Sequence, residues 1–114
     1  MPDAKTPQRA KTSKYKPGSV KIGAWNVKIR DVPRGRHSNL YGAFCEHNRT
    51  IYINRKTDAF TQASSLVHET LHCIAAQYGF EIEEEKVRIL ENALVSFIVD
   101  NPTVIATLIK ERSR

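Results

Sequence analysis

The sequence predicts an α+β domain in which a small, mostly antiparallel sheet precedes the helices. Near-alternating apolar residues, typical of strands, occupy the first half of the chain. In the second half, apolar residues recur at helical spacing. The segment His68-Glu69-Thr70-Leu71-His72, an H-E-x-x-H motif, lies in the first helix of that half. We expect a three-stranded sheet packed on the helix that carries this motif and on a second, antiparallel helix.

Three stretches have the composition of strands. Val20–Arg30 nearly alternates, with a slip in phase near Gly23 that indicates a bulge. Leu40–Cys45 and Thr50–Asn54 are the second and third strands. The turn residues Glu46–Arg49 between them predict a hairpin.

The motif helix is expected from roughly Thr57 to Tyr78. Thr57, Asp58 or Thr61 can cap its start, and Gly79 has the residue type that ends helices. A stripe at i, i+3 and i+4 spacing predicts its buried face, with the two histidines of the motif at the edge of that face. The stripe consists of Phe60, Ser64, Val67, Leu71, Ile74 and Tyr78.

Two further helices are expected after Gly79. The second helix covers roughly Glu83 to Asp100 and ends before Pro102. A short last helix is expected over Thr103–Ile109. The predicted core stripe of the second helix is Val87, Leu90, Leu94, Phe97 and Ile98, and that of the last helix is Val104, Ile105, Leu108 and Ile109.

Length and composition indicate one small domain. The chain has 114 residues, 40% of them hydrophobic, and no run of 18 apolar residues that would cross a membrane. Its first 18 residues lack the apolar segment of a signal peptide. We therefore expect a cytoplasmic protein without membrane contact, whose two cysteines, Cys45 and Cys73, are free thiols.

The basic charge is concentrated at the N-terminus. Residues 1–22 contain six Lys and Arg against Asp3, whereas residues 23–114 contain 12 basic and 11 acidic side chains. Residues 1–19 are therefore predicted to be a basic flexible arm, and residues 20–114 the folded domain. Such an arm can contact nucleic acid or an acidic partner. The alternative, which we favour, is a solvated tail.

The spacing of the motif suits metal chemistry. On a helix, His68 and His72 lie on one face, so both imidazoles can bind one metal ion. Zinc held by two histidines and one further ligand keeps a position for water and lowers the pKa of that water to about 7. Glu69 can then act as the general base. The alternative is a charged triplet on an ordinary surface helix.

The third protein ligand is expected on the second helix. Glu84 and Glu91 share the face of that helix that looks inward, and Glu85 lies about 100° away. Geometry therefore favours Glu84 and Glu91 without separating them. A structural zinc site, in which Cys45 and His47 join the two motif histidines, is a weaker alternative that leaves Glu69 without a role.

The order of elements resembles small zincin-type metallopeptidases, near the SprT-like and ImmA/IrrE families of phage and bacterial proteins. The resemblance covers roughly residues 40–102. It includes Tyr41-Gly42, Thr50-Ile51-Tyr52-Ile53-Asn54, Leu66-Val67-His68-Glu69-Thr70-Leu71-His72, Tyr78-Gly79, Glu84-Glu85-x-Val87 and Asp100-Asn101-Pro102.

This resemblance implies His68 and His72 as zinc ligands, Glu69 as the base and Glu84 as the third ligand. It also implies that Thr50–Asn54 is the edge strand of the sheet, so that Ile51, Tyr52 and Ile53 bind an extended peptide by strand addition. The expected function is a Zn²⁺-dependent peptidase that cleaves an intracellular protein. The alternative is a binding or regulatory protein that keeps the zincin scaffold and contacts a host protein or nucleic acid through its basic arm.

Overall fold

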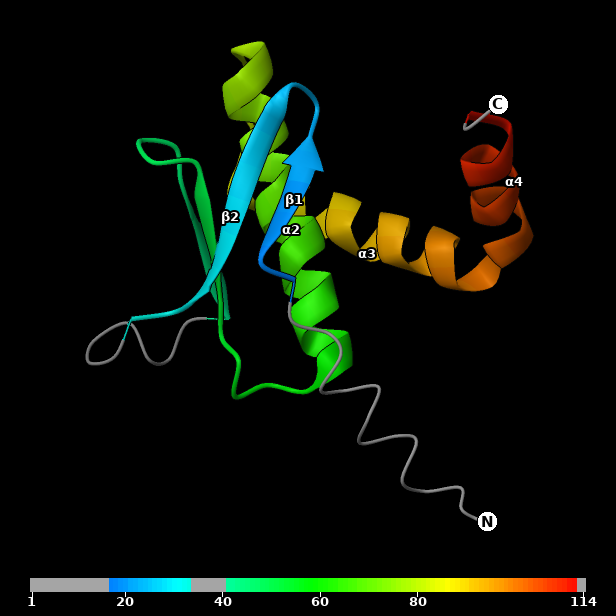
Figure 1. Ribbon diagram of the computed structural model, residues 1–114, viewed down its shortest axis with the longest axis horizontal. Coiled ribbons are helices and arrows are strands. Elements are labelled where there is room, and N and C mark those ends of the chain that lie inside the picture. The colour runs from blue at the N-terminus through cyan, green and yellow to red at the C-terminus, as the bar shows by residue number, and fades with distance from the viewer. Residues whose placement is uncertain (1–16, 34–40, 113–114) are drawn as a thin grey trace.

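The computed structural model describes residues 17–33 and 41–112 and shows an α+β fold (Figure 1). These residues form a four-stranded mixed sheet followed by three helices. The elements are β1 (Ser19–Ile22), β2 (Trp25–Asp31), β3 (Gly42–Cys45), β4 (Thr50–Ile53), α2 (Ala59–Tyr78), α3 (Glu84–Asp100) and α4 (Pro102–Arg112). The predicted basic arm lies mostly outside the described residues.

The prediction of three strands is wrong, because the stretch expected as the first strand forms two strands. The stretch from Val20 to Arg30 is a hairpin of β1 and β2. The chain reverses at Gly23, whose φ of 59° is a conformation that glycine adopts readily at the first position of a tight turn. The resulting strand order is β1-β2-β4-β3, in which β2 and β4 are parallel and the other two pairs antiparallel.

The strand expected at the sheet edge is an inner strand. β4 pairs with β2 on one side and with β3 on the other. Ile51 and Ile53 are 0% and 1% exposed, and the backbone of Tyr52 is used within the sheet. The prediction that Ile51, Tyr52 and Ile53 pair with a peptide is therefore wrong. Among the described strands, β3 is the edge next to β4.

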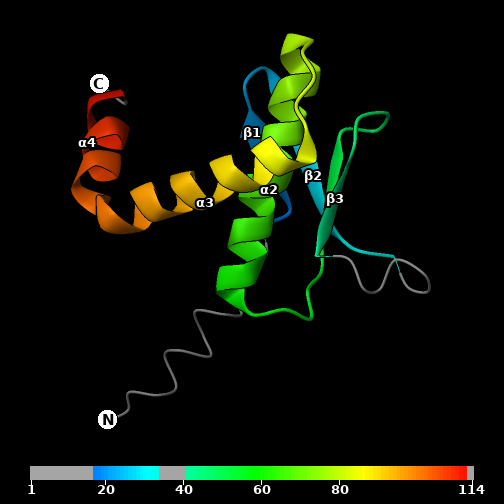
Figure 2. The same cartoon turned by 180° about the vertical axis from the view of Figure 1, so that it is seen from behind.

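The hydrophobic core lies between the sheet and α2, which crosses one face of the sheet (Figures 1 and 2). Branched apolar residues alternate along the strands, so that one side of each strand contributes to this layer. The buried cluster consists of Ile22, Val27, Ile29, Ile51, Ile53 and Cys73. Cys73 is fully buried, and burial raises the pKa of its thiol.

The ends of α2 agree with the sequence prediction, but its buried face does not. Asp58 caps the start by accepting a hydrogen bond from the Thr61 amide, and Gly79 ends the helix with a φ of 76°. Phe60 and Tyr78, both in the predicted buried stripe, are 62% and 70% exposed. The residues of α2 that are buried are Gln62, Ser65, Glu69, Cys73 and Ala75. The true inner face is therefore largely polar.

Helices α3 and α4 form an arm that extends from the body of the molecule. α3 crosses α2 with its N-terminal half and continues outward, and α4 then turns by 85° (Figures 1 and 2). Val87 is the one buried residue of α3, and α4 has none. The predicted core stripes of both helices are therefore wrong at most positions. The exposed large apolar residues of the arm are Ile89, Leu90, Leu94, Phe97, Ile98, Val99, Val104, Leu108 and Ile109.

Within residues 17–33 and 41–112, no single helix is long and apolar enough to span a membrane. α3 and α4 meet such a test of length and composition only as a pair, with the sharp bend between them.

Candidate metal centre

Helix α2 places both histidines of the motif on the side that α3 crosses. His68 and His72 are one helical turn apart, and their ring centroids are 5.3 Å from each other. Both side chains are partly buried, with 15% and 30% of their surface exposed. The two imidazoles are therefore close enough to share a single ligand.

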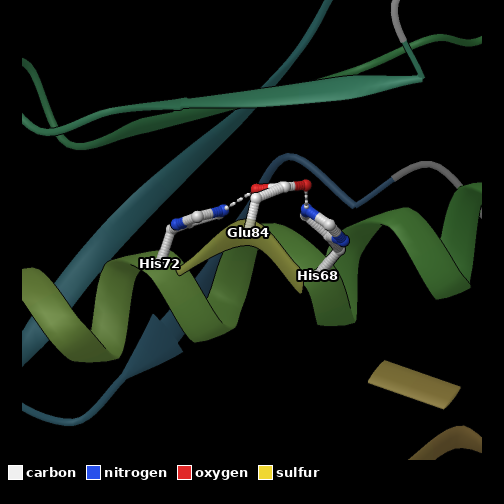
Figure 3. Close-up of side chains that lie close together, drawn as sticks. All are labelled: His68, His72 and Glu84. Atoms are coloured by element: carbon white, nitrogen blue, oxygen red, sulfur yellow. Dashed lines mark hydrogen bonds and ion pairs between the residues drawn. The ribbon is translucent and has the colours of Figure 1, made fainter. Parts of the chain in front are cut away.

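Glu84 lies between the two histidines (Figure 3). Its Oε2 atom is 2.8 Å from His68 Nε2, and its Oε1 atom is 3.0 Å from His72 Nε2. Burial opposes the charged form of this carboxylate, but the charges and hydrogen bonds of both histidines outweigh it and lower the pKa of Glu84. Of the acidic candidates for a third ligand, Glu84 is the one that contacts both imidazoles.

Glu91 has a different place, on the far side of His68. Its Oε1 atom is 2.8 Å from His68 Nδ1, and its Oε2 atom accepts a hydrogen bond from Ser64. A carboxylate on Nδ1 fixes the ring so that Nε2 keeps its lone pair for a metal. Glu91, one of the two candidate third ligands from the sequence, thus orients His68 instead. Its hydrogen-bond donor Ser64 lies outside the motif and could not be found from it.

The charge balance at His68 follows from these neighbours. Burial acts against protonation, but the hydrogen bond that His68 donates to Glu91 and the charges of Glu69, Glu84 and Glu91 prevail and raise the pKa of His68. In the absence of a cation, the imidazole therefore holds a proton more strongly than usual. A divalent cation at the same position would replace that proton.

Glu69 is the most buried acid of the site. It is 7% exposed, and burial raises the pKa of its carboxyl against the opposing effect of His68 and His72. Its Oε2 atom is 3.4 Å from the position that a Cβ on Gly42 would occupy, which places the carboxylate directly beneath β3. A carboxylate with a raised pKa is a better proton acceptor at neutral pH than an exposed one.

The site opens into a cleft beneath the edge strand β3. On the side of His68, a cavity of about 540 Å³ is lined by Tyr41, Gly42, Glu69, Arg88 and Asn92, among others. On the side of His72, a second cavity of about 620 Å³ continues past Phe44 and Phe80. Because Glu69 and His72 line both cavities, the site lies midway along one groove.

The donor set fits a zinc ion. Nitrogen and oxygen ligands about 2.0–2.1 Å from tetrahedral zinc lie about 3.3 Å from each other. The contacts of Glu84 with the two histidines are only a few tenths of an ångström shorter. Small side-chain rotations would therefore admit the ion, and two nitrogens with one carboxylate are a set that catalytic zinc uses.

The other predicted donors do not join this group. Among the described residues, the cluster with metal-binding potential contains His68, His72 and Glu84 and neither Cys45 nor His47. Glu85 is exposed and does not line either cavity of the groove. The remaining histidine of the chain, His37, lies outside the described residues. The four-ligand structural zinc site is therefore not formed.

No family model matches this sequence, and neither the curated proteins nor the solved structures contain a match to it. What the site can do is therefore inferred from its own geometry.

Proposed function

We propose that the protein is a zinc-dependent peptidase of zincin type that acts on an intracellular protein or peptide. One observation carries the proposal: Glu84, from a different helix, bridges the Nε2 atoms of His68 and His72. This convergence is what the H-E-x-x-H spacing requires for a catalytic metal, and it is not required of a surface helix.

Each residue of the site then has a chemical role. His68, His72 and Glu84 would hold the ion, which when bound supplies Lewis-acid activation of water and of the scissile carbonyl. Glu69 takes the proton of the attacking water and returns it to the nitrogen of the leaving amine. Glu91 keeps His68 in the tautomer that presents Nε2. Arg88 and Tyr41 line the groove and can donate to the developing oxyanion.

The edge strand β3 is the surface we assign to the substrate. The Asn54 amide donates to the Tyr41 carbonyl, and Ala43 pairs with Tyr52, so the alternation of antiparallel bonds points the backbone groups of Gly42 and Phe44 away from β4. These groups face the groove side by side with the metal centre. A peptide that pairs with β3 would therefore pass directly over Glu69.

The test measures zinc content and peptidase activity on the same samples. Wild type is expected to bind one zinc per chain, and His68→Ala and Glu84→Gln are expected to lose it. Glu85→Gln removes the same charge from a neighbouring exposed position and is the matched control. If the wild type takes up no zinc at neutral pH, the proposal is wrong.

A further pair of measurements separates an enzyme from a binding protein on the same scaffold. If zinc is bound but a library of extended peptides remains intact, the ion has no hydrolytic role. If peptides are cleaved by wild type and not by zinc-loaded Glu69→Gln, the peptidase assignment stands.

A further inference from the structure

The arm formed by α3 and α4 carries apolar surface that the rest of the described residues, 17–33 and 41–112, do not cover. Leu90, Leu94 and Phe97 lie at i, i+4 and i+7 and are 40–47% exposed. They lie within about 80° of Val87 on the same side of α3 and extend that side as a stripe toward α4. Among the described residues, α2 covers this side of α3 at Val87 and leaves the stripe exposed.

The contacts made within the described part of the chain do not account for the stability of helix α4. It has 11 residues, none of them buried, and the element it packs against is α3. Helices shorter than about 12–15 residues are marginal in water unless an apolar face is packed. Val104, Leu108 and Ile109 supply such a face, yet they are 42–64% exposed. Another surface is therefore needed to hold α4 in place.

The size and charge of the arm indicate what that surface is. Its exposed apolar side chains leave on the order of 800 Å² uncovered, which is what each partner contributes to a standard interface and exceeds the usual patch of a monomer. Residues 92–109 contain a single charged side chain, Asp100. A partner must therefore present an equally uncharged apolar face of the same extent, and a second copy of this arm does so.

We propose that the protein forms a two-fold symmetric dimer in which the α3–α4 arms of two copies pack against each other. Two-fold contacts between identical patches are the commonest form of self-association, because the surface needs only to complement itself. The 85° bend lets α3 and α4 of one arm enclose the arm of the other. This inference does not depend on the metal centre: Glu84, the ligand proposed on α3, is its first residue, whereas the substitutions that test the dimer lie in the second half of α3 and on α4.

The experiment is sedimentation velocity of the full chain over a range from micromolar to hundreds of micromolar. Wild type is expected to sediment as a particle of twice the chain mass. Leu94→Lys and Phe97→Lys are expected to raise the dimer dissociation constant by about 10- to 100-fold, because a buried charge replaces a central apolar contact. Leu108→Lys tests the α4 half of the face in the same way.

Ser96→Lys is the matched control, since it adds the same charge to α3 at an exposed position about 100° or more from the stripe. It is expected to leave the dimer intact. Far-UV circular dichroism shows whether each variant is folded, and all four positions are solvent-exposed in the single chain. If the wild type is monomeric at the highest concentration, the proposal is wrong. It is equally wrong if that monomer binds lipid vesicles through the arm. A dimer that tolerates all three stripe substitutions overturns it as well.

Discussion

At the scale of single residues, Glu69 and Glu84 differ because of what surrounds them. Glu84 is half exposed and ion-paired with two histidines, which lowers its pKa, whereas the buried Glu69 has a raised pKa. The more acidic group is suited to bind a cation, and the more basic group to accept a proton. We expect zinc-loaded Glu69→Gln to lose about 10²- to 10⁴-fold in peptidase kcat while keeping its zinc. Loss of the metal in this variant would instead make Glu69 a structural residue.

Glu91 provides a second test at this scale. Because its carboxylate holds His68 Nδ1, Glu91→Gln is expected to weaken zinc binding by about 10- to 100-fold without removing a ligand. Competition with a zinc chelator of known affinity measures this change. Glu85→Gln serves as the control for loss of one negative charge on α3. A complete loss of stoichiometric zinc in Glu91→Gln would show that Glu91 is itself a ligand.

The same groups make the stability of the metal-free protein depend on pH. Because the pKa of His68 is raised in the folded state, protonated His68 contributes fully to the free energy of unfolding below about pH 6.5. This contribution is lost as the pH rises through the folded-state pKa. The raised pKa of Glu69 also makes the folded state less stable as the pH rises. The lowered pKa of Glu84 has the opposite effect: ionised Glu84 stabilises the folded state above about pH 4.3, and this stabilisation is lost in acid. The Tm of metal-free protein should therefore fall as the pH rises above about 6.5. The fall should be smaller in His68→Gln, and an equal fall in both proteins would contradict this explanation.

At the scale of elements, the β1–β2 turn is fixed by α2. The side chain of Gln77 accepts from the Ala24 amide at 2.9 Å and donates to the Ile22 carbonyl at 2.8 Å. A Cβ on Gly23 would lie 2.1 Å from Gln77 Oε1, so the Gln77 side chain would have to move and give up these bonds. Gly23→Ala should cost about 2–3 kcal/mol of unfolding free energy, combining a strained φ with two lost hydrogen bonds.

Gly79 is the matched comparison for this turn. It also has a positive φ, but a Cβ there would meet nothing within 4 Å. Gly79→Ala should therefore cost only the backbone strain, about 1 kcal/mol. Urea unfolding of both variants measures the difference. In a Gln77→Ala background, Gly23→Ala and Gly79→Ala should reduce the free energy of unfolding by nearly the same amount. If Gly23→Ala remains more costly there, its extra cost does not come from Gln77.

The sequence predicts those features that depend on a few neighbouring residues. The ends of α2 at Asp58 and Gly79 and the β3–β4 hairpin follow from local capping and turn chemistry. The parallel pairing of β2 and β4 does not, because it joins segments separated by β3 in the chain. Helical spacing predicted that His68 and His72 share one face and that Glu84 or Glu91 approaches them, and the choice of Glu84 came from the family resemblance.

The buried face of α2 shows why hydrophobic periodicity failed there. That face contains Gln62, Ser65 and Glu69, of which Gln62 donates hydrogen bonds to the Arg55 and Thr57 carbonyls and Glu69 belongs to the site. A helix that borders a functional cleft buries polar groups, so the most apolar stripe is not the most buried one. On α3 the stripe predicted as a core face is buried only at Val87, and its other residues are exposed among the described elements.

At the scale of the whole molecule, the proposed metal centre also connects the α3–α4 arm to α2. Besides Val87, which is fully buried, Glu84 and Glu91 connect α3 to α2: Glu84 contacts His68 and His72, and Glu91 contacts His68 and Ser64. A zinc ion would replace hydrogen bonds across this connection with coordination bonds and so hold α3 to α2 more strongly.

Removal of zinc should therefore loosen one part of the molecule selectively. Chelation is expected to increase amide hydrogen exchange in α3 and α4, while the sheet keeps its protection because its core contains no residue of α3 or α4. Glu84→Gln should show the exchange pattern of the chelated protein before any chelator is added, and Glu85→Gln that of the zinc-loaded protein. Uniform loss of protection would mean that the ion stabilises the whole fold. Unchanged exchange in the arm would mean that the dimer contacts alone protect α3. The same measurement on monomeric Phe97→Lys separates the protection given by zinc from that given by the dimer.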